Sequence, residues 1–275
     1  MYLPIASASE IFGVVNRPLF AGAAMCTDPI TTPAAITRRR FLASSTATVA
    51  GVAALSGLPH ALYGAELNAA ELNAADRAAI FAPAPTTPAE ALAALVEGNR
   101  RFVDNKTIAP HRDFARLREI APKQAPFAAF LGCADSRVPI EIVFDQGFGD
   151  VFVSRIAGNI AVAEQIASLE FGTAVLGAKV LYVLGHTSCG AVSATMSGAE
   201  VPGQISALYF HIRPAVRVAN GNLDKAIIEN VRNQATALRD GSTVISKLVR
   251  EGKLLVVGGV YDLNTGKVTP VELSA

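Results

Sequence analysis

Cys133, His186 and Cys189 are residues of the types that bind transition metals, and two of them form a His-x-x-Cys pair. Two thiolates and one imidazole fill three of the four positions around a tetrahedral zinc ion, at about 2.3 Å from sulfur and about 2.0–2.1 Å from nitrogen. Three protein ligands leave the fourth position open, as in catalytic zinc sites. The three residues therefore predict one Zn²⁺ per chain, at a site that can carry out a reaction.

A carboxylate and a guanidinium follow the first of these cysteines. Asp135 is two residues beyond Cys133, and Arg137 is four residues beyond it. The carboxylate of Asp135 could bind the metal itself, or it could accept a hydrogen bond from metal-bound water. Arg137 could keep it ionised and oriented through a paired, charge-assisted contact. The first arrangement closes the site and the second opens it, and both remain possible at this point.

Each of these features has an ordinary explanation when it stands alone. A buried cysteine is usually a small hydrophobic residue. An Asp–Arg pair can be a simple salt bridge within a loop. The combination is more informative because it includes every cysteine that follows Cys26. We therefore favour metal binding over separate structural roles.

The surrounding pattern predicts an α/β fold with a mostly parallel sheet of four parallel strands plus an edge strand, flanked by helices. Short, continuous apolar runs are typical of strands that are buried on both faces. They occur at residues 127–131, 151–156, 180–184 and 254–260, and a last edge strand is expected at 267–271. Helical patterns occur at 88–103, 162–177, 204–219 and 223–251, and Thr87 is a suitable N-cap for the first of them. Strands alternating with helices in this way indicate parallel pairing.

This fold would bring the predicted ligands together. Cys133 comes just after the first predicted strand, and His186 just after the third. The carboxyl ends of parallel strands lie at one edge of the sheet, where ligands usually bind. We expect His186 and Cys189 to lie at the opening of a helix, where residues three apart face the same way.

The beginning of the chain has the layout of an export signal. Residues 38–40 are three arginines, followed by Phe41, Leu42 and a charge-free, weakly apolar run at 43–58. Paired arginines before Phe-Leu resemble the signal of the twin-arginine translocase, which carries folded proteins. The apolar run is 16 residues long, short of the roughly 20 that span a bilayer, which argues against the alternative of a membrane helix. We expect an export signal and linker at 1–65, a linker at 66–87, a folded domain at 88–275, and a periplasmic or secreted protein.

The composition excludes several classes of partner and fold. The net charge is only +1, which gives no field for binding nucleic acid. Three cysteines are too few for a disulfide framework.

In an oxidising periplasm two neighbouring thiols could pair, so folding and metal loading before export would protect Cys133 and Cys189.

Longer motifs around these residues resemble the β-class carbonic anhydrases. They are Glu-Gly-Asn-Arg-Arg-Phe at 97–102, Cys-Ala-Asp-Ser-Arg-Val at 133–138, Gly-His-Thr-Ser-Cys-Gly-Ala at 185–191 and, more weakly, Ile-Arg-Pro-Ala at 212–215. The resemblance runs from about residue 92 to 271. It implies that Cys133, His186 and Cys189 bind zinc, and that Asp135 and Arg137 together control the fourth position.

The resemblance also implies a substrate pocket and an oligomer. By position, Gln124 matches a polar side chain that binds bicarbonate, Phe152 and Phe171 match pocket aromatics, and the amide of Gly190 points into the same space. Gln124, and Phe130 in place of a tryptophan, are features of members with an open zinc site. Family members build the site across a dimer interface, so a homodimer or a dimer of dimers is expected.

The implied activity is the zinc-dependent, reversible hydration of CO₂ to bicarbonate and a proton by metal-bound hydroxide. Three alternatives share some of these features. The first is a carbon disulfide or carbonyl sulfide hydrolase on the same scaffold, which would have the same metal ligands. The second is a non-catalytic module stabilised by zinc, which would need a fourth protein ligand. The third is a cysteine-nucleophile enzyme, whose activity would survive removal of zinc.

Overall fold

The computed structural model of the chain describes residues 83–273. The predicted export signal at 1–65 and most of the predicted linker at 66–87 lie outside the described residues. Within the described range, no helix is both long and apolar enough to cross a membrane.

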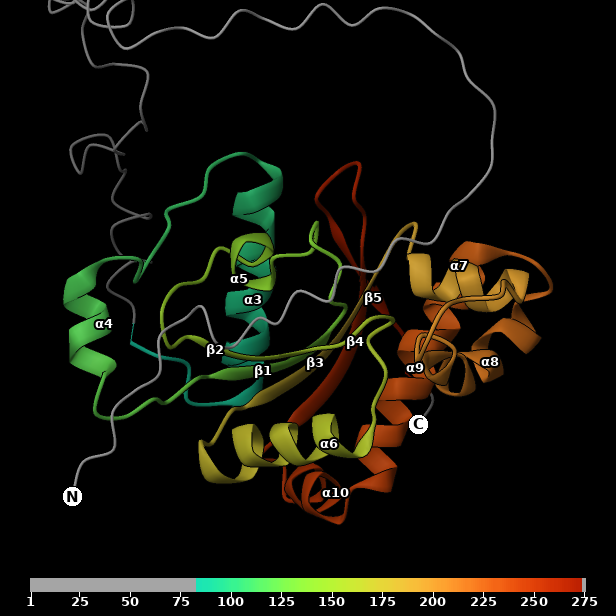
Figure 1. Cartoon of the computed structure of the whole chain (residues 1–275). Helices are drawn as coiled ribbons and strands as arrows, with labels where there is room; N and C mark the ends of the chain where they lie inside the picture. The colour runs from blue at the N-terminus through green and yellow to red at the C-terminus, as the bar shows by residue number, and fades with distance from the viewer. Residues whose placement is uncertain (1–82, 274–275) are drawn as a thin grey trace, which may run out of the picture. The chain divides into compact units, whose positions relative to one another are not determined.

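A five-stranded sheet runs through residues 83–273, in the order β2-β1-β3-β4-β5 (Figure 1). The first four of these strands are parallel, and the last pairs antiparallel with its neighbour. This confirms the predicted sheet of four parallel strands and an edge strand. The strands are β1 (Ala128–Gly132), β2 (Val151–Arg155), β3 (Val180–His186), β4 (Leu255–Tyr261) and β5 (Val268–Val271).

Helices cover both faces of the sheet. Successive side chains of a strand point to opposite faces, and in the inner strands both sets are apolar and pack against helices. On one face, Phe130 and Tyr182 pack beneath helix α3 (Pro88–Val103). On the other face, Leu131 and Leu181 pack against α6 (Ala163–Glu170), α9 (Leu223–Gly241) and α10 (Thr243–Arg250). Figure 1 shows α3 on one side of the strands and α6 and α10 on the other.

Helix α3 begins where its sequence predicts. The Thr87 side chain accepts a hydrogen bond from the backbone amide of Glu90, and Glu90 reaches back to the amide of Thr87. This capping box satisfies amide groups that would otherwise have no partner at the start of the helix. Leu95 is fully buried on the side of the helix that faces the sheet, whereas the neighbouring Val96 is 58% exposed.

The predicted helix at 223–251 is wrong as a single helix, because it consists of α9 and α10. Ser242 has an extended backbone between them, and its hydroxyl accepts from the amide of Ile245 to cap α10. The predicted helix at 162–177 is α6 followed by a π-helical turn, η1 (Phe171–Val175). The helix predicted at 204–219 is α8 (Ala207–Ala219). Two short helices were not predicted, α4 (Phe114–Ile120) and α5 (Ile140–Val143), whereas α7 (Gly190–Ser197) is the helix expected to open near Cys189.

Strand β2 also differs from the prediction of burial on both faces. It forms one end of the sheet, beside β1 alone. Its residues are partly or largely exposed, whereas those of β1 and β3 are all buried. An apolar run does not distinguish an inner strand from an edge strand, because the number of neighbours depends on the whole topology.

Candidate metal centre

Two neighbouring strands bring Cys133 and His186 to the same edge of the sheet. Cys133 directly follows β1, and His186 is the last residue of β3. In the parallel register Gly132 pairs with Leu184, so Cys133 lies close to the end of β3. The prediction that Cys133 and His186, 53 positions apart in the sequence, meet at one edge of the sheet is therefore confirmed.

The local geometry of the His-x-x-Cys pair differs from the prediction. We expected both residues at the opening of a helix, but His186 ends a strand and Cys189 is the N-cap of α7, with an extended backbone. Between them Ser188 has a φ of 55°, a left-handed conformation that is costly for a residue with a Cβ. This turn reverses the chain and returns Cys189 to the metal centre. Strand end and turn, rather than helical spacing, bring the two side chains together.

The three donor atoms lie within 4.8 Å of one another, and all three residues are buried. Ligands on a tetrahedral zinc ion are separated by roughly 3.5–3.8 Å, so small side-chain shifts suffice to bind one. His186 Nδ1 lies 2.9 Å from the carbonyl oxygen of Thr187, which can only accept, so Nδ1 carries the proton. His186 Nε2 is then an acceptor, yet it is buried with no hydrogen-bond partner in the described part of the chain. A buried nitrogen lone pair beside two thiols fits a zinc ion.

The thiols of Cys133 and Cys189 contact each other and shift each other's pKa in opposite directions. Hydrogen bonding from Cys189 lowers the pKa of Cys133, burial opposes this shift, and the backbone amide of Gly158 lowers the pKa further. The same contact with Cys133, together with burial, raises the pKa of Cys189. The Gly158 amide donates to Cys133 Sγ at 3.3 Å, as expected for a sulfur that carries negative charge.

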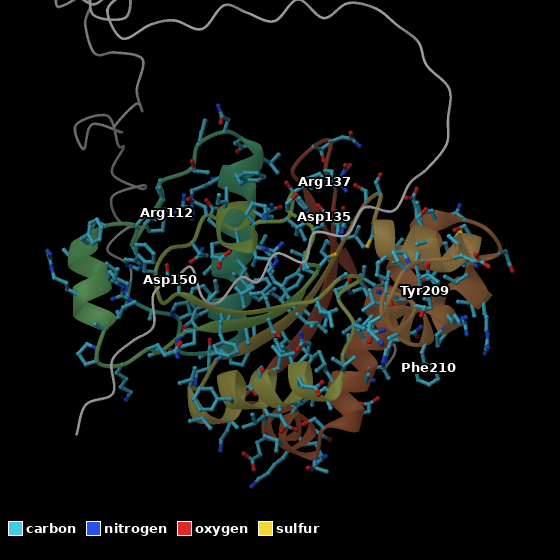
Figure 2. All side chains as sticks on the ribbon, viewed as in Figure 1. Arg112, Asp135, Arg137, Asp150, Tyr209 and Phe210 are labelled. Carbon is cyan, nitrogen blue, oxygen red and sulfur yellow. The ribbon has the colours of Figure 1, made fainter. Side chains whose placement is uncertain are left out.

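Asp135 and Arg137 form a paired contact beside the donor atoms (Figure 2). Arg137 Nε donates to Asp135 Oδ1 at 2.9 Å and Nη2 donates to Oδ2 at 2.8 Å, while the Arg137 backbone amide donates to Oδ1 at 2.9 Å. The Arg137 side chain holds the pKa of Asp135 well below its usual range, so the group is a carboxylate. Asp135 Oδ2 lies 3.8 Å from His186 Nε2. The carboxylate therefore borders the metal position while its oxygens are engaged by Arg137.

Arg155 is a contributor to the site that the sequence did not reveal. Its Nε donates to the carbonyl oxygen of Cys133 at 2.8 Å, and its Nη2 donates to that of Asp135 at 2.6 Å. The two bonds hold the loop that carries the first ligand and the carboxylate. Arg155 ends β2 and pairs with Gly132 in β1, a relationship that exists only once the register is known.

Of the four residues expected in the substrate pocket, only Gly190 is next to a donor residue, at the first position of α7. Gln124 precedes β1, whereas Cys133 follows it, so the strand separates them by about 15 Å. Phe152 lies early in β2, and its ring is 6.4 Å from that of Phe171, which is 46% exposed. Within one chain these three residues are not brought to the donor atoms.

The sequence of this domain matches the carbonic anhydrase family over residues 128–268. Carbonic anhydrase 2 of Mycobacterium tuberculosis is 35% identical over 190 residues, which are 66% of this chain and 92% of the relative. The chain belongs to the carbonic anhydrase family. It is a zinc enzyme that hydrates CO₂ reversibly to bicarbonate and a proton.

Solved structures place this carbonic anhydrase in the β class. The Coccomyxa β-carbonic anhydrase in complex with acetazolamide is 28% identical with a TM-score of 0.53, and the match covers 66% of this chain and 86% of that one. One of two tetrameric β-carbonic anhydrases from Sordaria macrospora shares the fold, with a TM-score of 0.55 at 23% identity over 58% of this chain and 87% of that one. The carbonic anhydrase therefore has the α/β fold expected from its sequence.

Proposed function

We propose that CO₂ hydration takes place at a zinc ion held by Cys133 Sγ, His186 Nε2 and Cys189 Sγ. The observation that carries this proposal is the buried Nε2 of His186, which has no hydrogen-bond partner within residues 83–273 and lies within 4.8 Å of both sulfurs. Zinc bound there would lower the pKa of a water ligand toward neutrality and so supply the nucleophile. A fourth protein ligand, which a purely structural site needs, is missing from this donor group in the described residues.

Asp135 and Arg137 would control the open position. The two side-chain bonds from Arg137 would keep both Asp135 oxygens from serving as metal ligands. Asp135 would then accept a hydrogen bond from the attacking water and direct its lone pair toward CO₂. The backbone amide of Gly190, at the start of α7, would donate to an oxygen of the substrate or product.

The rest of the substrate pocket would come from a second subunit of a homodimer or a dimer of dimers. In one chain Gln124, Phe152 and Phe171 lie away from the donor atoms, and Phe152 and Phe171 form a pair beside the open edge of the sheet. In a symmetric dimer these residues of the partner subunit would face the zinc of the first. Gln124 of the partner subunit would bind bicarbonate, and the two aromatic rings would exclude water from the CO₂ position.

The decisive experiment measures CO₂ hydration and the zinc-to-chain ratio on the same samples, before and after a chelator. We expect about one zinc per chain, loss of activity with the metal and recovery when zinc is restored. Acetazolamide is expected to inhibit, because the Coccomyxa relative was solved in complex with it. Full activity without zinc, or a metal content far below one per chain, would contradict the proposal. Parallel assays on carbonyl sulfide and carbon disulfide separate hydration from the related hydrolyses.

We also propose that residues 1–65 direct the enzyme through the twin-arginine translocase to the periplasm or beyond. The support is the sequence Arg38-Arg39-Arg40-Phe41-Leu42 before a weakly apolar run, together with two metal-binding thiols that benefit from folding before export. Changing Arg38 and Arg39 to lysine should leave active enzyme in the cytoplasmic fraction. Unchanged distribution between the fractions would refute this route.

A further inference from the structure

Thr187 ties the imidazole of His186 to the turn between β4 and β5. Its carbonyl oxygen accepts from His186 Nδ1 at 2.9 Å. Its backbone amide donates to the carbonyl oxygen of Tyr261 at 2.9 Å. Its hydroxyl oxygen accepts from the backbone amide of Leu263 at 3.0 Å. Thr187 is thus held from two sides while it holds the ring of a metal-binding residue.

The direction of the His186 ring depends on the peptide that joins Thr187 to Ser188. The Nδ1–H bond to the Thr187 carbonyl fixes the rotation of the imidazole, so Nε2 turns whenever that carbonyl turns. The next residue, Ser188, has a φ of 55°, which residues other than glycine avoid. A strained turn of this kind persists only where the surrounding contacts hold it. The Thr187 hydroxyl provides one such contact.

The other end of this contact is itself fixed. In the β4–β5 turn the Asp262 amide donates to Lys267 at 2.9 Å, and the Gly266 amide donates to Asp262 at 2.8 Å. The Asn99 side chain of α3 donates to the Gly266 carbonyl and accepts from the Val268 amide, both at 2.9 Å. Leu263 therefore lies in a turn that is held by hydrogen bonds within the turn and by hydrogen bonds to α3. It can serve as a rigid support for Thr187.

We propose that the Thr187 hydroxyl is a positioning group of the metal centre, which fixes the 187–188 peptide and thereby points His186 Nε2 at the zinc. This inference rests on the proposed role of His186 as a zinc ligand. Thr187 touches neither substrate nor the reacting atoms, so it acts through His186 alone. The β4–β5 turn, remote in sequence from the ligands, is on this view part of the zinc site.

The test compares Thr187→Val, which keeps the shape and removes the hydroxyl, with Thr187→Ser, which keeps the hydroxyl. Zinc release is followed with a chromophoric chelator on the purified enzyme. The visible spectrum of the cobalt-substituted enzyme reports ligand geometry. We expect the valine variant to release zinc about tenfold faster and to show shifted cobalt bands, since outer contacts of metal ligands change affinity by about 10–100-fold. The serine variant should behave like the unchanged enzyme in both measurements.

Ser242→Ala provides a matched control for general loss of stability. Ser242 is buried, and its hydroxyl also accepts from a backbone amide, that of Ile245 at 3.1 Å. It lies at the start of α10, which leads into the amino end of β4, whereas Thr187 follows the carboxyl end of β3. We expect Ser242→Ala to lower the thermal midpoint at least as much as Thr187→Val while leaving zinc release and the cobalt spectrum unchanged.

Unchanged zinc release and an unchanged cobalt spectrum in Thr187→Val would overturn the inference. Faster release in Ser242→Ala to the same extent would also overturn it, because the effect would then follow from stability alone. His186→Ala separates this failure from that of the proposed function: full zinc binding by His186→Ala would refute the ligand itself. If Thr187→Val does not accumulate in folded form, Thr187→Ala, which lets water reach the Leu263 amide, decides by the same two measurements.

Discussion

A cysteine in this chain acquires its role from its surroundings, since Cys26, Cys133 and Cys189 have the same side chain. Cys189 is buried, contacts Cys133 and caps α7. Serine at this position would keep the size, but its hydroxyl stays protonated at neutral pH and binds zinc poorly. We expect Cys189→Ser to lose most of its zinc and at least about 100-fold in CO₂ hydration, beyond the range for outer contacts. The measurement is metal content together with stopped-flow hydration.

Cys26→Ser is the matched control for that variant. It makes the same chemical change at the cysteine outside the proposed site, so zinc content and hydration should equal those of the unchanged enzyme. Equal loss of zinc in both variants would contradict the ligand assignment.

Arg137 acts through the shape of its guanidinium as well as its charge. Lysine retains the charge but cannot make the two parallel bonds to Asp135. Without the two parallel bonds the carboxylate of Asp135 can turn, and misplacement of a group beside the reacting atoms can lower the rate by about 100-fold. We therefore expect Arg137→Lys to lower kcat/KM about 10–100-fold at unchanged zinc content, measured at a fixed pH.

Arg100→Lys is the comparison for Arg137→Lys. Arg100 makes a similar double contact with Glu97 and is about as exposed as Arg137. Glu97, however, is 48% exposed, whereas Asp135 is 18% exposed and borders the metal position. Such surface pairs contribute little, so hydration should not change. A loss of zinc in Arg137→Lys would instead indicate that Asp135 and Arg137 serve only to hold the loop.

The two thiolates also set the expected pH dependence. Together they cancel the formal charge of a zinc ion, so water bound there loses its proton at higher pH than in an all-histidine site. Deprotonated water is the active form, and hydration should therefore rise from about pH 6 to about pH 9. The measurement is the rate of CO₂ hydration in buffers of constant ionic strength. A flat profile over this range would argue against the proposed ligand set.

At the scale of elements, α3 is held to the sheet by the motif at residues 97–102, one of those that resemble the β-class carbonic anhydrases. Gly98 lies so close to α5 that a Cβ would overlap the carbonyl oxygen of Phe144. The Asn99 side chain bonds to Val143, Gly266 and Val268, which belong to α5 and the β4–β5 hairpin. Buried Arg101 donates to the buried carboxylate of Asp145 at 2.7 Å. The motif thus has a structural role: it connects α3 to α5 and to the β4–β5 hairpin.

Removing the Asn99 side chain tests this structural role. Asn99→Ala leaves two carbonyl oxygens and one amide without their partner, and three such bonds at about 1 kcal/mol each predict a loss of about 2–4 kcal/mol in the free energy of unfolding. Denaturant unfolding measures it. Asn233→Ala, on the partly exposed side of α9, is the control, because its side chain has no hydrogen-bond partner in the described residues. A loss below about 0.5 kcal/mol for Asn99→Ala, as for an ordinary surface change, would refute the role.

The sequence predicted the five strands, the longer helices and the grouping of Cys133, His186 and Cys189, because these depend on residue type and coarse order. The carboxyl ends of parallel strands lie at one edge of the sheet for any conformation of the connecting loops, so Cys133 and His186 could be predicted to lie close together. The backbone between His186 and Cys189 could not be predicted, since nothing marks Ser188 for a left-handed conformation and cysteine is not a usual N-cap. The break at Ser242 coincides with Gly241-Ser242, a residue pair suited to end one helix and begin another, which the prediction did not use. The contacts of Arg155 with the Cys133 and Asp135 carbonyls could not be predicted, because they depend on the register between β1 and β2.

At the scale of the whole molecule, the sheet separates the two parts of the proposed active site. The donor atoms lie at the carboxyl edge, whereas Gln124 lies at the amino edge, and Phe152 lies in the strand at the open end. Figure 2 shows the same separation. Asp135 lies beyond the carboxyl end of β1, and Asp150 lies at the amino end of β2, on the opposite edge of the sheet. A single chain therefore offers a metal site on one side and a pocket wall on the other, and symmetry can join them.

Mixed dimers test this division. Cys189→Ser lacks the metal but keeps the pocket wall, and Phe152→Ala keeps the metal but lacks part of the wall. If each site combines the zinc of one subunit with Phe152 of the partner subunit, co-expression produces one intact site in every mixed dimer, and random pairing predicts about a quarter of the full activity. A pocket built within one chain gives no intact site, so the mixture would show only the mean of the two variants. Cys189→Ser mixed with His186→Ala is the control, because both lesions affect the metal and no pairing can restore it. Activity in the first mixture that does not exceed this mean would show that each chain completes its own site.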